Sequence, residues 1–158
     1  MAVKRHIFLI AAILLSTSAM AETAIESCDA LFSAKSSHGL LIVERAGKVV
    51  GASKIDHEID GGAFSNDDSL LIIYGLPRNV SGRSPQRTFL SIFRVNRVSL
   101  FIKEEYESRV YDVSFSVDQR VAVVDSRFGV DVIDLVKRKS TFYDPTYTPD
   151  FATQKCER

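Results

Sequence analysis

The sequence has few residues of the kinds that usually perform catalysis or bind metal ions. Among its 158 residues there are only three histidines and two cysteines. Most general acid–base schemes use histidine, and most zinc sites use clusters of cysteine and histidine. We therefore expect no enzymatic activity, no metal site and no cofactor.

The sequence also lacks an excess of positive charge and a long apolar run. Its 20 basic residues balance its 20 acidic residues, whereas a nucleic-acid-binding protein needs a basic surface. The longest apolar run is residues 7–15, and a membrane-spanning helix needs about 20 apolar residues. We expect no nucleic-acid partner and no membrane span in the mature chain.

The N-terminus has the three parts of a secretory signal peptide. A basic leader (residues 4–5) precedes the apolar run at 7–15, and an Ala-Met-Ala sequence ends at Ala21. We predict cleavage after Ala21, a single mature domain of residues 22–158 and a location in the periplasm. Cleavage removes two of the 20 basic residues and no acid, so the mature net charge is −2.

The two cysteines, Cys28 and Cys156, lie near opposite ends of the mature chain. In an oxidising compartment such a pair indicates a disulfide. Closing so long a loop stabilises a fold by about 4–5 kcal/mol in the chain-entropy model. Two free thiols are the alternative, and they would need a reducing compartment or a metal.

After the leader, the apolar runs are short and rich in β-branched or aromatic residues, which indicates strands. In residues 111–115 apolar and polar residues alternate, so Tyr111, Val113 and Phe115 are expected to share a buried face. Only residues 24–35 favour a turn or two of helix. The sequence predicts an all-β domain of antiparallel meanders, with strands at residues 39–44, 48–52, 70–74, 89–95, 98–102, 110–115, 120–125 and 130–136.

Two stretches repeat the same order of elements. Residues 62–74 and 113–125 each contain a strand that ends in Phe-Ser, an acid-containing turn and an apolar strand. This pattern resembles the blades of β-propellers, whose inner strands often read Phe-Ser-Pro-Asp-Gly; the matching residues are 64–68 and 115–119. The resemblance implies two full blades and part of a third at residues 39–55. They would form an incomplete ring, because a complete propeller needs at least about four blades.

The first repeat carries an insertion. Residues 75–87 occupy the place where the second repeat has the short connector 126–129. Long loops inside compact domains are often functional, or else flexible, and both interpretations stay open here. The insertion holds three arginines and no acid. We predict that it contacts a protein partner through Arg78, Asn79, Ser81, Gly82, Arg83 and Ser84.

Two stretches imitate catalytic or metal-binding motifs without meeting their requirements. Residues 82–86 lack the final glycine of a nucleophile elbow. Residues 56–67 lack the bidentate glutamate and the flanking helices of a calcium loop. A hydrolase that uses His57 with nearby acids is a weaker alternative to a binding protein.

Residues 61–68 lead into an apolar strand and then a serine-containing loop. Together with the chain's size, signal peptide and terminal cysteine, this stretch resembles the periplasmic immunity proteins that neutralise cell-wall amidase effectors of the bacterial type VI secretion system. The resemblance implies that the loop with Ser81, Gly82 and Ser84 plugs the catalytic cleft of a secreted peptidoglycan amidase. The alternative is a periplasmic propeller-like interaction module with no toxin partner.

Overall fold

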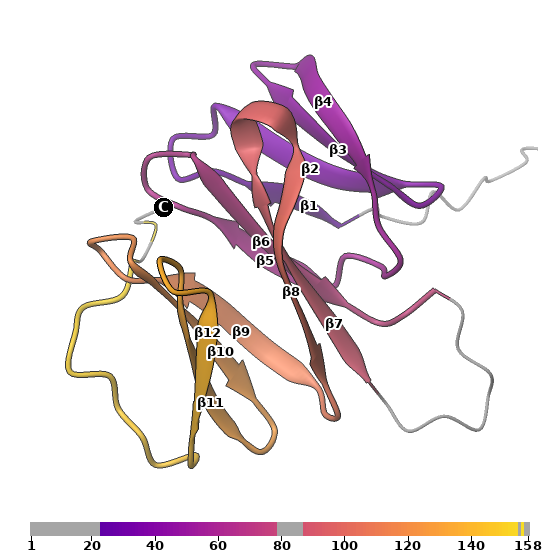
Figure 1. Ribbon diagram of the computed structural model, residues 1–158. Helices are drawn as coiled ribbons and strands as arrows, with labels where there is room; N and C mark the ends of the chain where they lie inside the picture. The colour runs from indigo at the N-terminus through magenta and orange to yellow at the C-terminus, as the bar shows by residue number, and fades with distance from the viewer. Residues whose placement is uncertain (1–22, 79–86, 155, 157–158) are drawn as a thin grey trace, which may run out of the picture.

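The computed structural model describes residues 23–78, 87–154 and 156. They form three four-stranded antiparallel sheets and one short 3-10 helix, η1 (Val95–Arg97). None of the described helices is long and apolar enough to span a membrane. Each sheet is a meander, and the three sheets fan out from the line where their first strands meet (Figure 1). The prediction of an all-β fold built from propeller-like blades is confirmed.

In each sheet, which we call a blade, the strands follow one another from the inner strand to the outer edge. Blade 1 contains β1 (Ala24–Glu26), β2 (Phe32–Ser37), β3 (Leu40–Arg45) and β4 (Lys48–Lys54). Blade 2 contains β5 (Gly61–Phe64), β6 (Leu70–Gly75), β7 (Thr88–Arg94) and β8 (Ser99–Tyr106). Blade 3 contains β9 (Val110–Phe115), β10 (Val121–Ser126), β11 (Gly129–Asp134) and β12 (Lys139–Tyr143).

The first blade is complete, whereas the sequence indicated only part of a blade at residues 39–55. Its strands β1 and β2 occupy the stretch for which a helical turn was expected, and that expectation is wrong. The Ser27 hydroxyl donates to the Asp29 carboxylate (2.6 Å) and accepts the N–H of Phe32 (2.9 Å). These bonds reverse the chain direction directly after the three residues of β1, so a helix cannot form across residues 24–35.

The same Ser-x-Asp turn joins the first and second strands of every blade. In blade 2, the Ser65 hydroxyl donates to Asp67 Oδ1 (2.8 Å) and accepts the N–H of Leu70 (2.9 Å). Ser116 makes the equivalent bonds in blade 3. The residue three positions after each serine has a left-handed backbone: Ala30 (φ 57°), Asp68 (φ 55°) and Gln119 (φ 58°). The repeat therefore occurs three times in the structure.

The blades pack face to face and bury one apolar core at each of the two junctions. Alternation along β6 sends Leu71 and Ile73 to one core and Ile72 to the other, because successive strand residues point to opposite faces. The core between blades 1 and 2 contains Ile25, Ala34, Leu41, Val43, Ile59, Phe64, Leu71, Ile73, Phe93, Val95 and Val98. The core between blades 2 and 3 contains Ile72, Leu90, Ile92, Ile102, Tyr106, Val110, Val113, Phe115, Ala122, Val124, Ile133 and Leu135.

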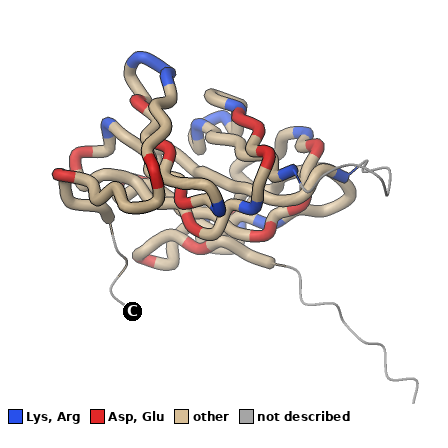
Figure 2. Tube along the Cα trace, turned by 90° about the horizontal axis from the view of Figure 1, so that it is seen from below, with Lys and Arg blue, Asp and Glu red and all other residues tan. Residues whose placement is uncertain are grey.

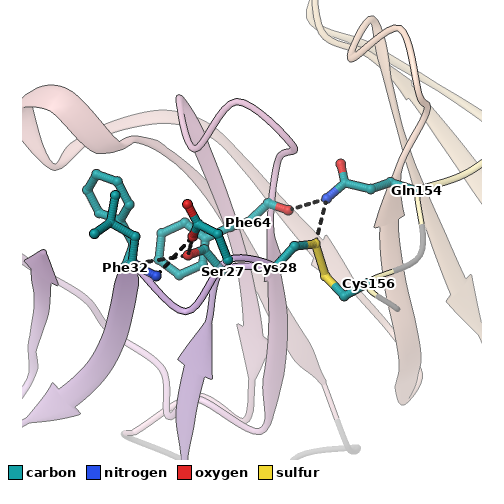
Figure 3. The surroundings of a disulfide bond; sticks show 8 residues. Ser27, Cys28, Phe32, Phe64, Gln154 and Cys156 are labelled. Atoms are coloured by element: carbon teal, nitrogen blue, oxygen red, sulfur yellow. Dashed lines mark hydrogen bonds between the residues drawn. A yellow bond between two sulfur atoms is a disulfide. The ribbon is translucent and has the colours of Figure 1, made fainter. Parts of the chain in front are cut away.

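The C-terminal tail, of which residues 144–154 and 156 are described, leaves the outer edge of blade 3 and returns to the inner strands (Figure 1, yellow). Thr153 forms an antiparallel bridge with Ser116, directly after β9. The Gln154 side chain then donates to the carbonyl oxygen of Phe64 in blade 2 (3.0 Å; Figure 3). The tail thus connects blade 3 to blade 2 through hydrogen bonds.

A disulfide between Cys28 and Cys156 carries this connection on to blade 1 (Figure 3). The two Cα atoms are 5.1 Å apart, within the usual range for disulfides. The predicted pairing is confirmed. Because Cys28 is the middle residue of the Ser-x-Asp turn of blade 1, the bond ties the tail to the repeated part of the fold.

Candidate partner-binding site

The first stem of the predicted contact loop, residues 75–78, leaves blade 2 at the end of the molecule opposite the disulfide, toward the lower right of Figure 1. The linkers that enter β5 and β9 lie at the same end, as do the β2–β3 and β10–β11 turns. The N–H of Arg127 in the β10–β11 turn donates to the carbonyl oxygen of Arg109 (3.0 Å). We call this region the loop end, and we call the region of the Ser-x-Asp turns the turn end.

Of the predicted contact residues, the structure describes Arg78. The others, Asn79, Ser81, Gly82, Arg83 and Ser84, lie outside the described residues, as does the predicted signal peptide. Arg78 belongs to the stem of the loop, where its Nε donates to Glu58 Oε1 (2.8 Å). Its guanidinium also lies against Gly39, where an added Cβ would be only 2.6 Å from Arg78 Nη1.

The first stem of the loop is held by a short backbone ladder. The N–H of Glu58 donates to Leu76 O (2.8 Å), and the N–H of Arg78 donates to Asp56 O (2.9 Å). Gly75 permits this close approach, because a Cβ at that position would collide with the carbonyl of Glu58. The pairing of β5 with β6 therefore continues past the sheet and fixes the direction in which the loop leaves.

Ion pairs hold the first stem, at Arg78, and the second stem, at Arg87, against neighbouring segments. They are exposed pairs, of a kind that contributes about 0–1 kcal/mol each, so the backbone ladder dominates. Elsewhere on the described chain, charges of both signs are interspersed (Figure 2). The stem pairs are Arg78–Glu58 (2.8 Å) and Arg87–Glu105 (2.7 Å), and a third pair, Lys103–Asp56, joins β8 to the linker before β5.

His57 lies beneath the first stem with 0% of its surface exposed. Its Nδ1 is 2.7 Å from Glu58 O and its Nε2 is 2.9 Å from Ser91 Oγ. Because a carbonyl can only accept, Nδ1 carries the proton, and the Ser91 hydroxyl donates to Nε2. Burial lowers the pKa of His57 below its usual value of 6.5, although the bond to Glu58 opposes this shift.

The His57–Ser91 pair superficially resembles a catalytic base and nucleophile. Ser91 is only 3% exposed, so both side chains are shielded from any substrate. The geometry supports a structural role, in which neutral His57 joins the linker before β5 to strand β7. Among residues 23–78, 87–154 and 156, no group of three or more histidine, cysteine, aspartate or glutamate side chains could hold a metal ion.

Beside the stem, a pocket of about 480 Å³ opens between blades 2 and 3. The Tyr74 hydroxyl donates to Tyr111 O (3.0 Å) across it. Burial raises the pKa of Tyr74, and the carboxylates of Asp112 and Asp60 raise it further, so this hydroxyl stays a donor at neutral pH. The lining includes Asp60, Tyr74, Leu76, Thr88, Arg109 and Tyr111.

Large apolar side chains exposed at the loop end include Leu76 (47%), Tyr111 (54%) and Phe128 (58%). The guanidinium of Arg127 lies over the Phe128 ring, 5.8 Å from its centroid. Aromatic and arginine side chains are enriched at protein interfaces and at their energetic hot spots. The loop end therefore offers an apolar and arginine-bearing surface around a fixed stem.

The sequence did not indicate this surface. It predicted Tyr111 on a buried face with Val113 and Phe115, and that expectation is wrong. The pairing of β9 with β10 shifts register between Asp125 and Ser126, so the alternation is interrupted beside Tyr111. Leu76 and Phe128 lie outside the strands, in segments where periodicity carries no signal.

Comparison with known proteins establishes the fold. No protein-family model and no curated protein matches the sequence. Among solved structures, similar chains include hydrazine synthase from Kuenenia stuttgartiensis, with a TM-score of 0.59 and 16% identity over 79% of this chain and 37% of that one. A WD40 domain from Toxoplasma gondii coronin has a TM-score of 0.51 and 14% identity, over 77% and 33%. The chain has a β-propeller-like fold.

A eukaryotic initiation factor shows the same likeness, with a TM-score of 0.53 and 12% identity over 75% of this chain and 31% of that one. The chain therefore spans about a third of the length of each of these proteins. At such low identity the likeness concerns the fold alone, because one fold supports many functions.

Proposed function

We propose that the protein is a non-enzymatic, exported binding protein that docks on a protein partner with its loop end. The observation that carries this proposal is the fixed loop stem, with its backbone ladder from Asp56 to Arg78, beside the exposed Leu76, Tyr111 and Phe128. A rigid scaffold that presents a loop in a fixed direction reduces the entropy lost on binding.

The specific form of the proposal is that the partner is a secreted peptidoglycan amidase and that the chain acts as its immunity protein. The signal peptide and the disulfide both fit a protein that works in the periplasm. In this scheme the hydroxyls of Ser81 and Ser84 hydrogen-bond the Cys–His pair of the amidase while the loop excludes the cell-wall substrate. The resemblance to periplasmic immunity proteins supports this choice of partner.

The test begins with a pull-down of the mature protein from native periplasm, with the partner identified by mass. We then measure amidase inhibition by the wild type and by a variant in which residues 79–86 are replaced with a Gly-Ser linker of equal length. Arg97→Ala, at the turn end, is the matched control. We expect the wild type and the control to inhibit, and the loop variant to lose most of its inhibition.

Each outcome has a defined meaning. If the captured partner is not an amidase, the immunity role is wrong and the interaction module without a toxin partner is correct. If the loop variant inhibits as well as the wild type, occlusion by the loop is wrong. Capture of no protein from the native periplasm contradicts both forms of the proposal.

A further inference from the structure

The inner strands of the three blades leave one set of strand edges without a neighbouring strand. Each of β1, β5 and β9 is the terminal strand of its sheet, so one edge of each is unpaired over most of its length. These strands lie side by side along the line where the blades meet (Figure 1). Unpaired strand edges are templates for extended peptide segments.

Two cavities lie along these inner strands, one toward each end of the molecule. At the turn end, a cavity of about 370 Å³ is lined by Glu26, Gly62, Asp112 and Gln154, among others. At the loop end, the lining of the 480 Å³ pocket includes Asp60, just before β5, and Tyr111 of β9. Both cavities are lined by residues of β9 and by residues in or just before β5, and we call the two together the axial groove.

The described lining of the axial groove holds more acidic than basic residues. Each inner strand, or the residue just before it, contributes one exposed carboxylate: Glu26, Asp60 and Asp112. No ion pair involves these three carboxylates in the described chain. Among the described residues that line the two cavities, the one basic residue is Arg109, at the loop-end mouth. An occupant with positive charge fits this groove by charge complementarity.

The protein's own tail shows that the free edge of β9 accepts an extended segment. The N–H of Val117 donates to Ala152 O (3.0 Å), and the N–H of Gln154 donates to Phe115 O (2.7 Å). Gln154 Oε1 is buried at the same place and has no hydrogen-bond partner among the described residues. Beyond Phe115 toward the loop end, the edge of β9 has no such strand beside it.

We propose that the axial groove binds an extended segment of a partner protein that carries lysine or arginine. The backbone of the segment would hydrogen-bond to the free edge of β9 next to the tail. Its cationic side chains would form ion pairs with Asp112, Glu26 and Asp60. This proposal goes beyond the docking function of the loop end, and the described lining that carries it belongs to the inner strands, the residues beside them and the tail.

The test uses labelled octapeptides with alternating lysine and valine, and peptides of the same length with glutamate or glutamine in place of lysine. Fluorescence anisotropy measures their binding to the mature, disulfide-bonded protein. Amide chemical shifts locate the binding site. We expect the lysine peptide alone to bind, to shift amides of β5 and β9, and to bind more weakly as salt increases.

Variants of one groove carboxylate make the test specific. Asp112→Lys should lower the affinity for the lysine peptide at least tenfold, and the isosteric Asp112→Asn should lower it several-fold with the thermal unfolding midpoint largely unchanged. Glu107→Lys, an exposed charge reversal outside the groove lining, should leave the affinity within twofold. Equal binding of the glutamate peptide, unchanged affinity in Asp112→Asn, or shifts confined to other strands would overturn the proposal. None of these outcomes affects the loop-end test.

Discussion

Replacing both cysteines with serine removes the covalent tie between the tail and blade 1. The Cys28–Cys156 bond spans a sequence separation of 128 residues. For a loop of that length, the chain-entropy model gives about 5 kcal/mol of stabilisation at 25 °C. A domain of this size has a total stability of about 5–15 kcal/mol, so the double variant should lose a large part of it.

The loss should also have a local component at the turn end. Gln154 Nε2 lies 3.6 Å from Cys28 Sγ and donates to Phe64 O, so freeing the tail exposes these groups to water. Hydrogen exchange of the inner strands near the turn end should therefore accelerate more than exchange at the loop end. Equilibrium urea unfolding of the oxidised wild type, the reduced wild type and the double variant measures the global effect.

The expected result is a decrease of several kcal/mol in the free energy of unfolding, equal in the reduced wild type and the double variant. A control, Ser53→Ala, is a conservative change on β4, the outer strand of blade 1, and should change stability by less than about 1 kcal/mol. If the double variant unfolds within 1 kcal/mol of the oxidised wild type, the three blades do not depend on the tail. In that case our account of how the fold is held together is incorrect.

Three further perturbations test the described contacts. Because burial lowers the pKa of His57 in the folded state, the protein should lose stability as the pH drops below about 6.5. His57→Gln should reduce this loss, as measured by urea unfolding midpoints from pH 8 to pH 5. Burial raises the pKa of Glu104, and the nearby Asp131 carboxylate raises it further, so ionisation of Glu104 destabilises the folded state once the pH rises above its unfolded pKa near 4.5. Glu104→Gln should therefore stabilise the protein at pH 7 and not at pH 3. Equal free energies of unfolding for the variant and the wild type at pH 7 would contradict this reasoning. Ser65→Ala, which removes both bonds of a Ser-x-Asp turn, should cost about 1–2 kcal/mol by thermal or urea unfolding.

The sequence was informative where the repeat carries its full pattern. Phe-Ser before an acid-containing turn marked blades 2 and 3, since Phe64 and Phe115 are both core residues. Blade 1 has Glu26 in place of the phenylalanine, and its second strand reads Phe-Ser-Ala-Lys-Ser-Ser with Ala34 as its only buried residue. The two inner strands of blade 1, β1 and β2, could therefore not be predicted from apolar residues, although the Ser-x-Asp spacing was present at Ser27.

The candidate site was less predictable, because it forms from residues that are distant in the sequence. The position of the insertion and the disulfide follow from local pattern and from counting cysteines. The loop-end pocket brings Tyr74 of blade 2 next to Tyr111 of blade 3, and only the packing of the blades sets that distance. The burial of His57 likewise depends on Ser91, which is 34 residues further along the chain.

The most direct test of the proposed function is hydrogen–deuterium exchange of the mature protein with and without the partner captured from native periplasm. We predict slower exchange at the loop end in the complex, in residues 75–78, 87–89, 109–111 and 126–129. Protection confined to the turn end, or to the outer strands β4, β8 and β12, would contradict the claim that the loop end is the docking surface.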